Sequence, residues 1–158
     1  MTQRELLEQR QTLLDGFESS QGLPEHKPPG TENELQQYLN MNKTIIEALD
    51  ASTAASIAVR LSQYAFYFQR TLGRQKSIKT WADAELQHIT CKEIMQYDKY
   101  TPNKLNLVCM DNSAANELRQ ISLYAQQRID RFEELASGIR NISYVIGLVF
   151  KSRMGDNK

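Results

Sequence analysis

Hydrophobic residues in the C-terminal part of the chain recur at alternating spacings of three and four positions, with no proline among them. This spacing is typical of a helix with one buried face, and a strict seven-residue repeat favours long helices packed side by side. The repeating positions are Leu118, Ile121, Ala125, Arg128, Phe132, Leu135, Ile139, Ile142, Ile146, Val149 and Arg153. A second row runs beside them and consists of Ile129, Ala136, Ser143 and Phe150.

The apolar face of this helix is broader than the surface that one partner helix usually covers. We therefore expect copies of the chain to pack together, with Arg128 and Arg153 at core positions that specify register and copy number. The predicted homo-oligomer interface comprises Leu118, Ile121, Phe132, Leu135, Ile139, Ile142, Ile146, Val149 and Phe150.

The N-terminal segment has its own helical pattern. Thr2 and Glu5 fit a capping box, and a stripe of apolar residues follows as far as about Phe17. The next ten residues, QGLPEHKPPG, include three prolines and two glycines, which a helix does not tolerate. We therefore divide the chain into an acidic helix at 1–20, tethered rather than packed in the main core, a linker at 21–30 and a helical domain at 31–158.

The middle of the chain predicts two more helices. Thr31 opens a long helical pattern, with a break or kink near residue 50 and a C-terminal cap at Gly73. Another helix is expected over roughly 77–97. The helical pattern then fails over 98–112, where the alternation at 105–109 suggests a short strand or an extended arm. Together these elements predict an all-α, long-helix bundle that is oligomeric, with its N-terminal helix on a proline-rich linker.

Composition agrees with a single folded domain. The chain has 158 residues, of which 41% are hydrophobic and 24% charged, as in ordinary globular proteins. Its two cysteines are too few for a disulfide framework, and the N-terminus lacks an apolar signal segment. We therefore expect a cytoplasmic protein that does not enter membranes (host cytoplasm, if a phage encodes it).

A formal net charge of zero conceals an uneven distribution. Residues 1–50 carry nine acids and four bases, a balance of −5, whereas residues 51–104 carry eight bases and four acids, a balance of +4. This distribution argues against a surface that binds nucleic acid everywhere, but it allows a local basic site and contacts between the acidic and basic segments of different subunits.

The basic middle segment contains the strongest candidate for a binding site. Its cations lie close to aromatic residues, and cations neutralise phosphates while exposed aromatic faces stack bases, so the combination suits single-stranded nucleic acid. The alternative is ordinary: cations collect at helix C-termini, and these aromatic residues could be core. The predicted nucleic-acid-binding residues are Arg70, Arg74, Lys76, Lys79, Trp81, Lys92, Lys99, Tyr100 and Lys104.

Other chemistry has less support. His88 and Cys91 are three residues apart on an expected helix, and Cys109 could join them at a metal ion, but no second pair with metal-ligand spacing accompanies them. No phosphate-binding, nucleophile-elbow or zinc-protease motif is present. We therefore expect no cofactor, no metal and no enzymatic activity.

Three segments resemble the UvsY-type recombination mediators of tailed phages. They are YAFYFQRTLGRQKSIKTWADAEL at 64–86, MQYDKY at 95–100 and the closing heptad helix at 117–153, and the resemblance covers roughly residues 55–154. It implies a helical homo-oligomer that binds single-stranded DNA and helps a RecA-like recombinase load onto strands covered by a single-strand binding protein. By position, the resemblance assigns DNA contacts to Lys76, Lys79, Lys92, Lys99 and Tyr100.

One departure from the family pattern concerns the helix before the 98–112 segment. The family usually carries several cations there, whereas this chain has Lys92 followed by Glu93, which shifts weight to the segment from Arg70 to Lys79. Two other functions stay open: a helical scaffold or adaptor that binds only protein partners, and a small helical enzyme with an unrecognised metal site.

Overall fold

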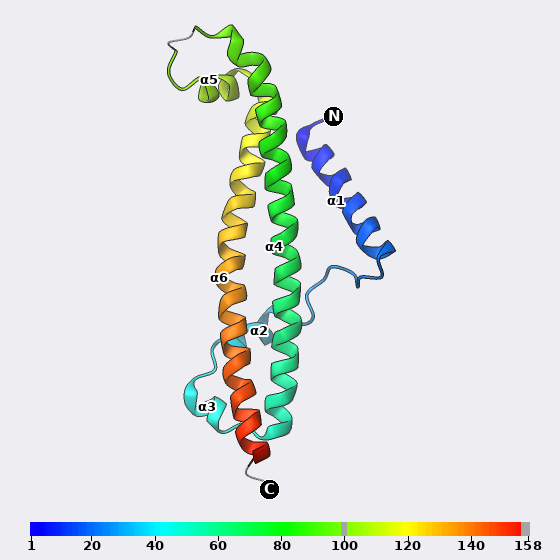
Figure 1. Ribbon diagram of the computed structural model, residues 1–158, viewed down its shortest axis with the longest axis vertical. Coiled ribbons are helices and arrows are strands. Elements are labelled where there is room, and N and C mark those ends of the chain that lie inside the picture. Colours follow the sequence, from blue (N-terminus) through cyan, green and yellow to red (C-terminus); the bar gives the residue numbers. More distant parts are fainter. Residues whose placement is uncertain (99–100, 156–158) are drawn as a thin grey trace. The chain divides into compact units, whose positions relative to one another are not determined.

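The computed structural model describes residues 1–98 and 101–155. Within these residues there is no strand, which confirms the predicted all-α fold built from long helices (Figure 1). The elements are α1 (Gln3–Ser20), α2 (Glu32–Leu39), α3 (Lys43–Glu47), α4 (Ala51–Glu93), the 3-10 turn η1 (Ile94–Gln96), α5 (Lys104–Asp111) and α6 (Ser113–Gly155).

The chain divides into two compact units, each containing one half of α4 and one half of α6. Unit 1 comprises residues 1–25 and 73–130, and unit 2 comprises residues 26–72 and 131–158. In each unit the two helix segments run antiparallel and side by side (Figure 1).

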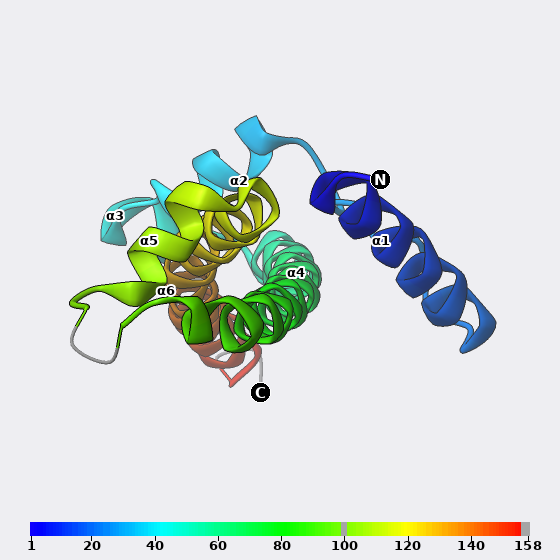
Figure 2. The ribbon, with the colours of Figure 1, turned by 90° about the horizontal axis from the view of Figure 1, so that it is seen from above.

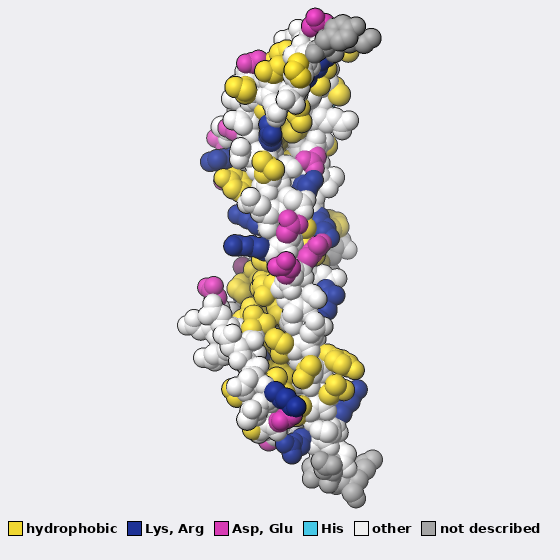
Figure 3. Space-filling model, turned by 90° about the vertical axis from the view of Figure 1, so that its left-hand side faces the viewer, with side chains coloured by type: hydrophobic (Ala, Val, Ile, Leu, Met, Phe, Trp, Pro, Cys, Tyr) yellow, Lys and Arg dark blue, Asp and Glu magenta, His cyan; other side chains and the backbone are white. Residues whose placement is uncertain are grey.

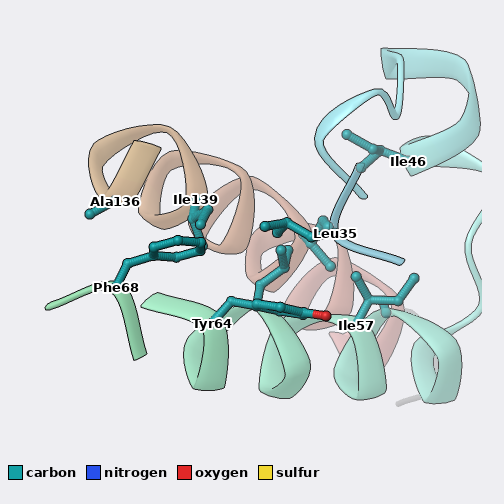
Figure 4. Packing of buried hydrophobic residues seen from close by; sticks show 10 residues of the cluster. Leu35, Ile46, Ile57, Tyr64, Phe68, Ala136 and Ile139 are labelled. Atoms are coloured by element: carbon teal, nitrogen blue, oxygen red, sulfur yellow. The ribbon is translucent and has the colours of Figure 1, made fainter. Parts of the chain in front are cut away.

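The core of unit 2 forms where α4 and α6 meet. Leu35 of α2 and Ile46 of α3 complete it beside Ile57, Tyr64 and Ile139 (Figure 4). The buried members also include Ala54, Leu61, Phe68, Ala136 and Ile146. The short helices α2 and α3 therefore cover apolar surface that the two long helices leave open.

The buried face of α6 differs in part from the sequence prediction. One row of the predicted repeat is confirmed, because Leu118, Ala125, Ile139 and Ile146 are buried and Phe132 is half-buried. The second row is also buried at Ile129 and Ala136, and the buried Ala115 extends that row toward the start of α6. The row from Ile121 to Val149 lies at the edge and is only partly covered.

Arg128 and Arg153 are not core positions, contrary to the sequence prediction. Both are exposed, and Arg153 donates a hydrogen bond to the carbonyl of Glu47 at 2.6 Å. Long charged side chains reach solvent from the edge of a helix interface, so a heptad count alone does not place them inside.

Alanines occupy several of the most enclosed positions along the two long helices. Ala54, Ala82 and Ala115 are completely buried, and Ala125 and Ala136 are 2% exposed. Small side chains at an interface allow two helix backbones to approach closely. Bulky buried residues such as Leu61, Leu118 and Ile146 fill the remaining positions.

A polar network in unit 2 fixes the end of the linker to α4. The Glu34 carboxylate accepts hydrogen bonds from Tyr38 at 2.9 Å and from Arg60 at 3.1 Å, while Arg60 also donates to the Pro29 carbonyl. The Tyr64 hydroxyl lies 2.9 Å from the Thr31 carbonyl and 3.1 Å from Glu34 Oε2. The linker therefore ends in a defined position on α4.

This network shifts two pKa values in opposite directions. The hydrogen bond from Tyr38, assisted by Tyr64 and Arg60, outweighs partial burial and lowers the pKa of Glu34. Burial, followed by the neighbouring Glu34 carboxylate, raises the pKa of Tyr64 to about 12. Both shifts favour a carboxylate that accepts and a phenol that donates.

We predict that Tyr64→Phe lowers the free energy of unfolding by about 1–3 kcal/mol at pH 8, because a buried hydrogen bond to a charged group is lost. Because the pKa of Tyr64 is raised in the folded protein, its protonated phenol stabilises the fold fully at pH values below the ordinary tyrosine pKa of about 10. This stabilisation disappears as the pH rises toward 12 and the phenol ionises. Denaturant unfolding followed by circular dichroism should therefore show the difference between the two proteins shrinking above pH 10. Tyr144→Phe is the control, since Tyr144 is 69% exposed; an equal loss there would contradict the prediction.

In unit 1, the second half of α4 and the first half of α6 carry α1 on one side and α5 on another (Figure 2). Val108 and Cys109 of α5 are buried with Ala115 of α6. Leu86, Ile89, Ile94 and Tyr97 pack against this small cluster.

The segment 105–109 is helical, so the expected strand or extended arm is wrong. The covered positions of α5 are Lys104, Leu107, Val108 and Cys109. The first three follow the helical spacing of three and four, which the alternation of Leu105, Leu107 and Cys109 concealed. Asn103 begins the helix with a left-handed backbone, φ 54°, which asparagine tolerates better than most residues.

Gly73 does not end a helix, because α4 continues through it to Glu93. The buried positions Phe68, Thr71, Gln75 and Ala82 keep the three-and-four spacing across the glycine. Continuous packing outweighs the cost of about 1 kcal/mol of a glycine inside a helix. The predicted break near residue 50 is confirmed, with an unpredicted one at Asn40–Asn42 that separates α2 from α3.

Candidate nucleic-acid interface

The predicted nucleic-acid-binding residues fall into three groups. Arg74, Lys76, Lys79, Trp81, Lys92 and Lys104 belong to unit 1, whereas Arg70 belongs to unit 2. Lys99 and Tyr100 lie outside the described residues. The candidate interface therefore lies on α4 within unit 1.

The cations of α4 in unit 1 lie on two flanks of the helix. At about 100° of rotation per residue, Arg74, Trp81 and Lys92 differ by only about 20° and share one flank. Lys76 lies about 160° away from Arg74, and Lys79 about 140°. We name the first group, Arg74, Trp81 and Lys92, the tryptophan flank.

Arg74 is held by two acids of α1. Its Nη2 donates to Glu18 Oε2 at 2.7 Å and to Asp15 Oδ1. Only 15% of the Arg74 side chain is exposed. Partial burial disfavours the charged guanidinium, but the hydrogen bonds and charges of Glu18 and Asp15 outweigh it and raise the pKa of Arg74.

Trp81 is also in contact with α1. The guanidinium carbon of Arg10 lies 5.1 Å from the centre of the Trp81 ring, within the range of a cation–π interaction. At the start of α1, the backbone amide of Gln3 donates to Glu117 of α6 at 3.0 Å.

The linker composition predicts that α1 is only tethered, but the structure shows that it lies on unit 1. The contacts named above are polar, and α1 contributes no fully buried residue, although Leu6, Leu7 and Leu14 are half-buried. Its capping box at Thr2 and Glu5 is confirmed.

On the other flank, Lys79 pairs within its own helix. Lys79 contacts Asp83, whose other carboxylate oxygen accepts a hydrogen bond from Ser122 of α6. Partial burial alone would raise the pKa of Asp83, but the hydrogen bonds from Lys79 and Ser122 together with the charge of Lys79 outweigh it and lower that pKa. Lys79 therefore belongs to a polar cluster that joins α4 to α6 through Asp83 and Ser122.

The remaining predicted cations of unit 1 are more accessible. Lys76 and Lys92 are exposed on α4, and Lys104 is half-buried at the start of α5. On the face drawn in Figure 3, Lys and Arg side chains alternate with Asp and Glu and with hydrophobic side chains. That face therefore offers no uninterrupted basic surface.

The predicted oligomer-interface residues of α6 divide into fully buried and half-buried residues. Leu118, Ile139 and Ile146 are completely buried inside their own units, so they are not available to another subunit. Phe132, Phe150 and the edge row Ile121, Leu135, Ile142 and Val149 are half-buried. Tyr144, Val145 and Leu148 are exposed by 69%, 44% and 47%.

Other surface features of the described residues have no clear ligand chemistry. A groove of about 470 Å³ in unit 2 is lined by Glu34, Tyr38, Val59, Arg60 and Gln63. The charged groups of Glu34 and Arg60 are paired with each other there. Within residues 1–98 and 101–155 no three His, Cys, Asp or Glu side chains could hold a metal ion together.

Sequence reasoning did not find the three α1 residues that contact the tryptophan flank. Asp15 and Glu18 are one helical turn apart on α1, and the segment 70–79 contains basic residues but no acid. A search for acids elsewhere that could neutralise this segment would have pointed to α1.

Comparisons with known proteins do not place the chain in a family: no family model matches it, and neither do the curated proteins or the solved structures. In the part of the chain that the structure describes, no helix is both long enough and apolar enough to cross a membrane.

Proposed function

We propose that this protein is a non-catalytic accessory protein that binds single-stranded DNA and associates with copies of itself. The observation that supports this best is the tryptophan flank. One side of α4 presents a guanidinium, an indole and an ammonium group along about 27 Å of helix. Cations bind phosphates, and an aromatic face stacks a base without preference for sequence.

Self-association would come from the partly covered edge of α6. Ile142 and Val149 lie beside the exposed Val145 and Leu148 of the same helix, so apolar surface remains outside the unit 2 core. An assembly would present several tryptophan flanks to one strand, and weak individual contacts would then give useful affinity.

The resemblance to UvsY-type mediators suggests the biological context, which is assistance in loading a RecA-like recombinase onto DNA covered by a single-strand binding protein. Lys76, Lys79 and Lys104 remain predicted contacts that would extend the surface beyond the tryptophan flank. Arg70, Lys99 and Tyr100 remain predictions as well.

The second candidate is an adaptor that binds only protein partners. It is favoured by the same exposed apolar residues of α6 together with the engagement of Arg74 and Lys79 by acids. The two candidates differ in their response to polynucleotide, because an adaptor of this kind has no phosphate contacts.

We predict that the protein binds a labelled single-stranded oligonucleotide more tightly than the duplex of the same sequence. The logarithm of the affinity should fall linearly with the logarithm of salt concentration, with a slope of about −0.7 for each phosphate contact. Fluorescence anisotropy at several salt concentrations measures the preference for single strands and the salt dependence. Absence of binding to either DNA at about 50 mM salt would favour the adaptor.

A further inference from the structure

Helix α1 contacts two residues of the tryptophan flank, Arg74 and Trp81, at the positions where phosphates and a base of a polynucleotide would bind. The Asp15 and Glu18 carboxylates bind Arg74 as phosphate oxygens would. The Arg10 guanidinium lies over the Trp81 ring, where a base would stack. The two side chains best suited to DNA are thus both in contact with a segment of the same chain.

The attachment of α1 is suited to release. None of its residues is fully buried. Of the two acids that hold Arg74, the Asp15 side chain is 61% exposed and that of Glu18 15% exposed, so salt screens chiefly the attraction of Asp15. Helix α1 ends at Ser20, and the linker that follows contains three prolines. The helix can therefore move without unwinding α4 or α6. Segments held by few buried contacts open at low free-energy cost.

We infer that α1 is a removable cover of the DNA-binding surface and that single-stranded DNA displaces it. This inference rests on the proposed function and adds regulation to it. A strand that reaches Arg74 takes the place of Asp15 and Glu18, and a base takes the place of Arg10 on Trp81. The released acidic helix then becomes available for other contacts.

Competition of this kind has a quantitative consequence. The apparent dissociation constant equals the intrinsic one divided by the fraction of molecules in which the flank is open. A cover closed in about nine molecules of ten weakens binding about tenfold. Removing the attraction between α1 and Arg74 should recover that factor.

Trp81 reports on the cover directly, because it is the single tryptophan of the chain. In the full-length variant Asp15→Asn/Glu18→Gln, we expect acrylamide to quench Trp81 fluorescence more efficiently than in the unmodified protein. The control Glu8→Gln/Glu134→Gln removes the same two negative charges from exposed positions. It should leave quenching unchanged, and circular dichroism should show equal helix content in all three proteins.

The same three proteins are then titrated into labelled oligo-dT at low salt. The inference expects the Asp15→Asn/Glu18→Gln variant to bind about tenfold more tightly than the control. Measurable but equal binding by variant and control, or quenching equal to that of the control, would overturn the cover and leave the proposed function standing. Failure of all three proteins to bind would overturn the proposed function and the inference with it.

Discussion

Ile139→Asn is expected to unfold unit 2. Ile139 is completely buried in the core that α4 and α6 form with α2 and α3. The substitution removes buried apolar volume and leaves an amide without a hydrogen-bond partner, so we expect a loss of about 4–5 kcal/mol. Since domains are stable by only about 5–15 kcal/mol, thermal unfolding followed by circular dichroism should show a large fall in melting temperature and in helix content.

Ile142→Asn is the matched control, three residues further along α6. Ile142 lies at the partly covered edge, so the same change should retain the helix content and instead reduce self-association in light scattering. If Ile139→Asn dissolved an oligomer while its subunits stayed folded, Ile139 would belong to an interface between subunits, and the packing described for unit 2 would be wrong.

Charge reversal on the tryptophan flank is expected to abolish DNA binding. Arg74→Glu/Lys92→Glu should weaken oligonucleotide binding at least about 100-fold at low salt, because each change removes a phosphate contact and adds a repelling charge. The slope of log affinity against log salt should also fall in magnitude by about 1.4, since two contacts of about 0.7 each are lost. Anisotropy titrations at several salt concentrations measure both effects.

A control pair of substitutions is available on the same helix, α4. Lys76→Glu/Lys79→Glu makes the same change in charge in the same unit but on the other flank of α4. We expect a much smaller loss of affinity from that pair. Equal losses would mean that binding follows net charge alone, and a larger loss from Lys76 and Lys79 would move the DNA surface to their flank.

Local signals in the sequence predicted most of the helical framework. Thr2 and Thr31 each accept a hydrogen bond from the backbone of the first helical turn that follows, and the linker between α1 and α2 is not helical. The predicted break near residue 50 also holds such a cap, at Asp50, which was not predicted from the sequence. Such caps depend on residues three positions apart, so a single sequence reveals them.

Features that depend on distant residues were harder to predict. Thr71 and Gln75 are buried polar residues on either side of Gly73, and they hid the repeat that carries α4 through the glycine. The edge position of Arg128 depends on where the partner helix lies. The pairing of Arg74 with Asp15 joins residues 59 positions apart, and no local sequence pattern predicts it.

In each unit, the buried alanines of α4 and α6 limit which helix could replace either partner. Ala54, Ala82 and Ala136 have almost no exposed surface, so a leucine or isoleucine at any of these positions would overpack the layer around it. A helix of another protein that carries a large residue in every layer could not approach these small positions closely, and voids would remain around them. We therefore expect these small buried positions to select against partner helices that carry a large residue in every layer.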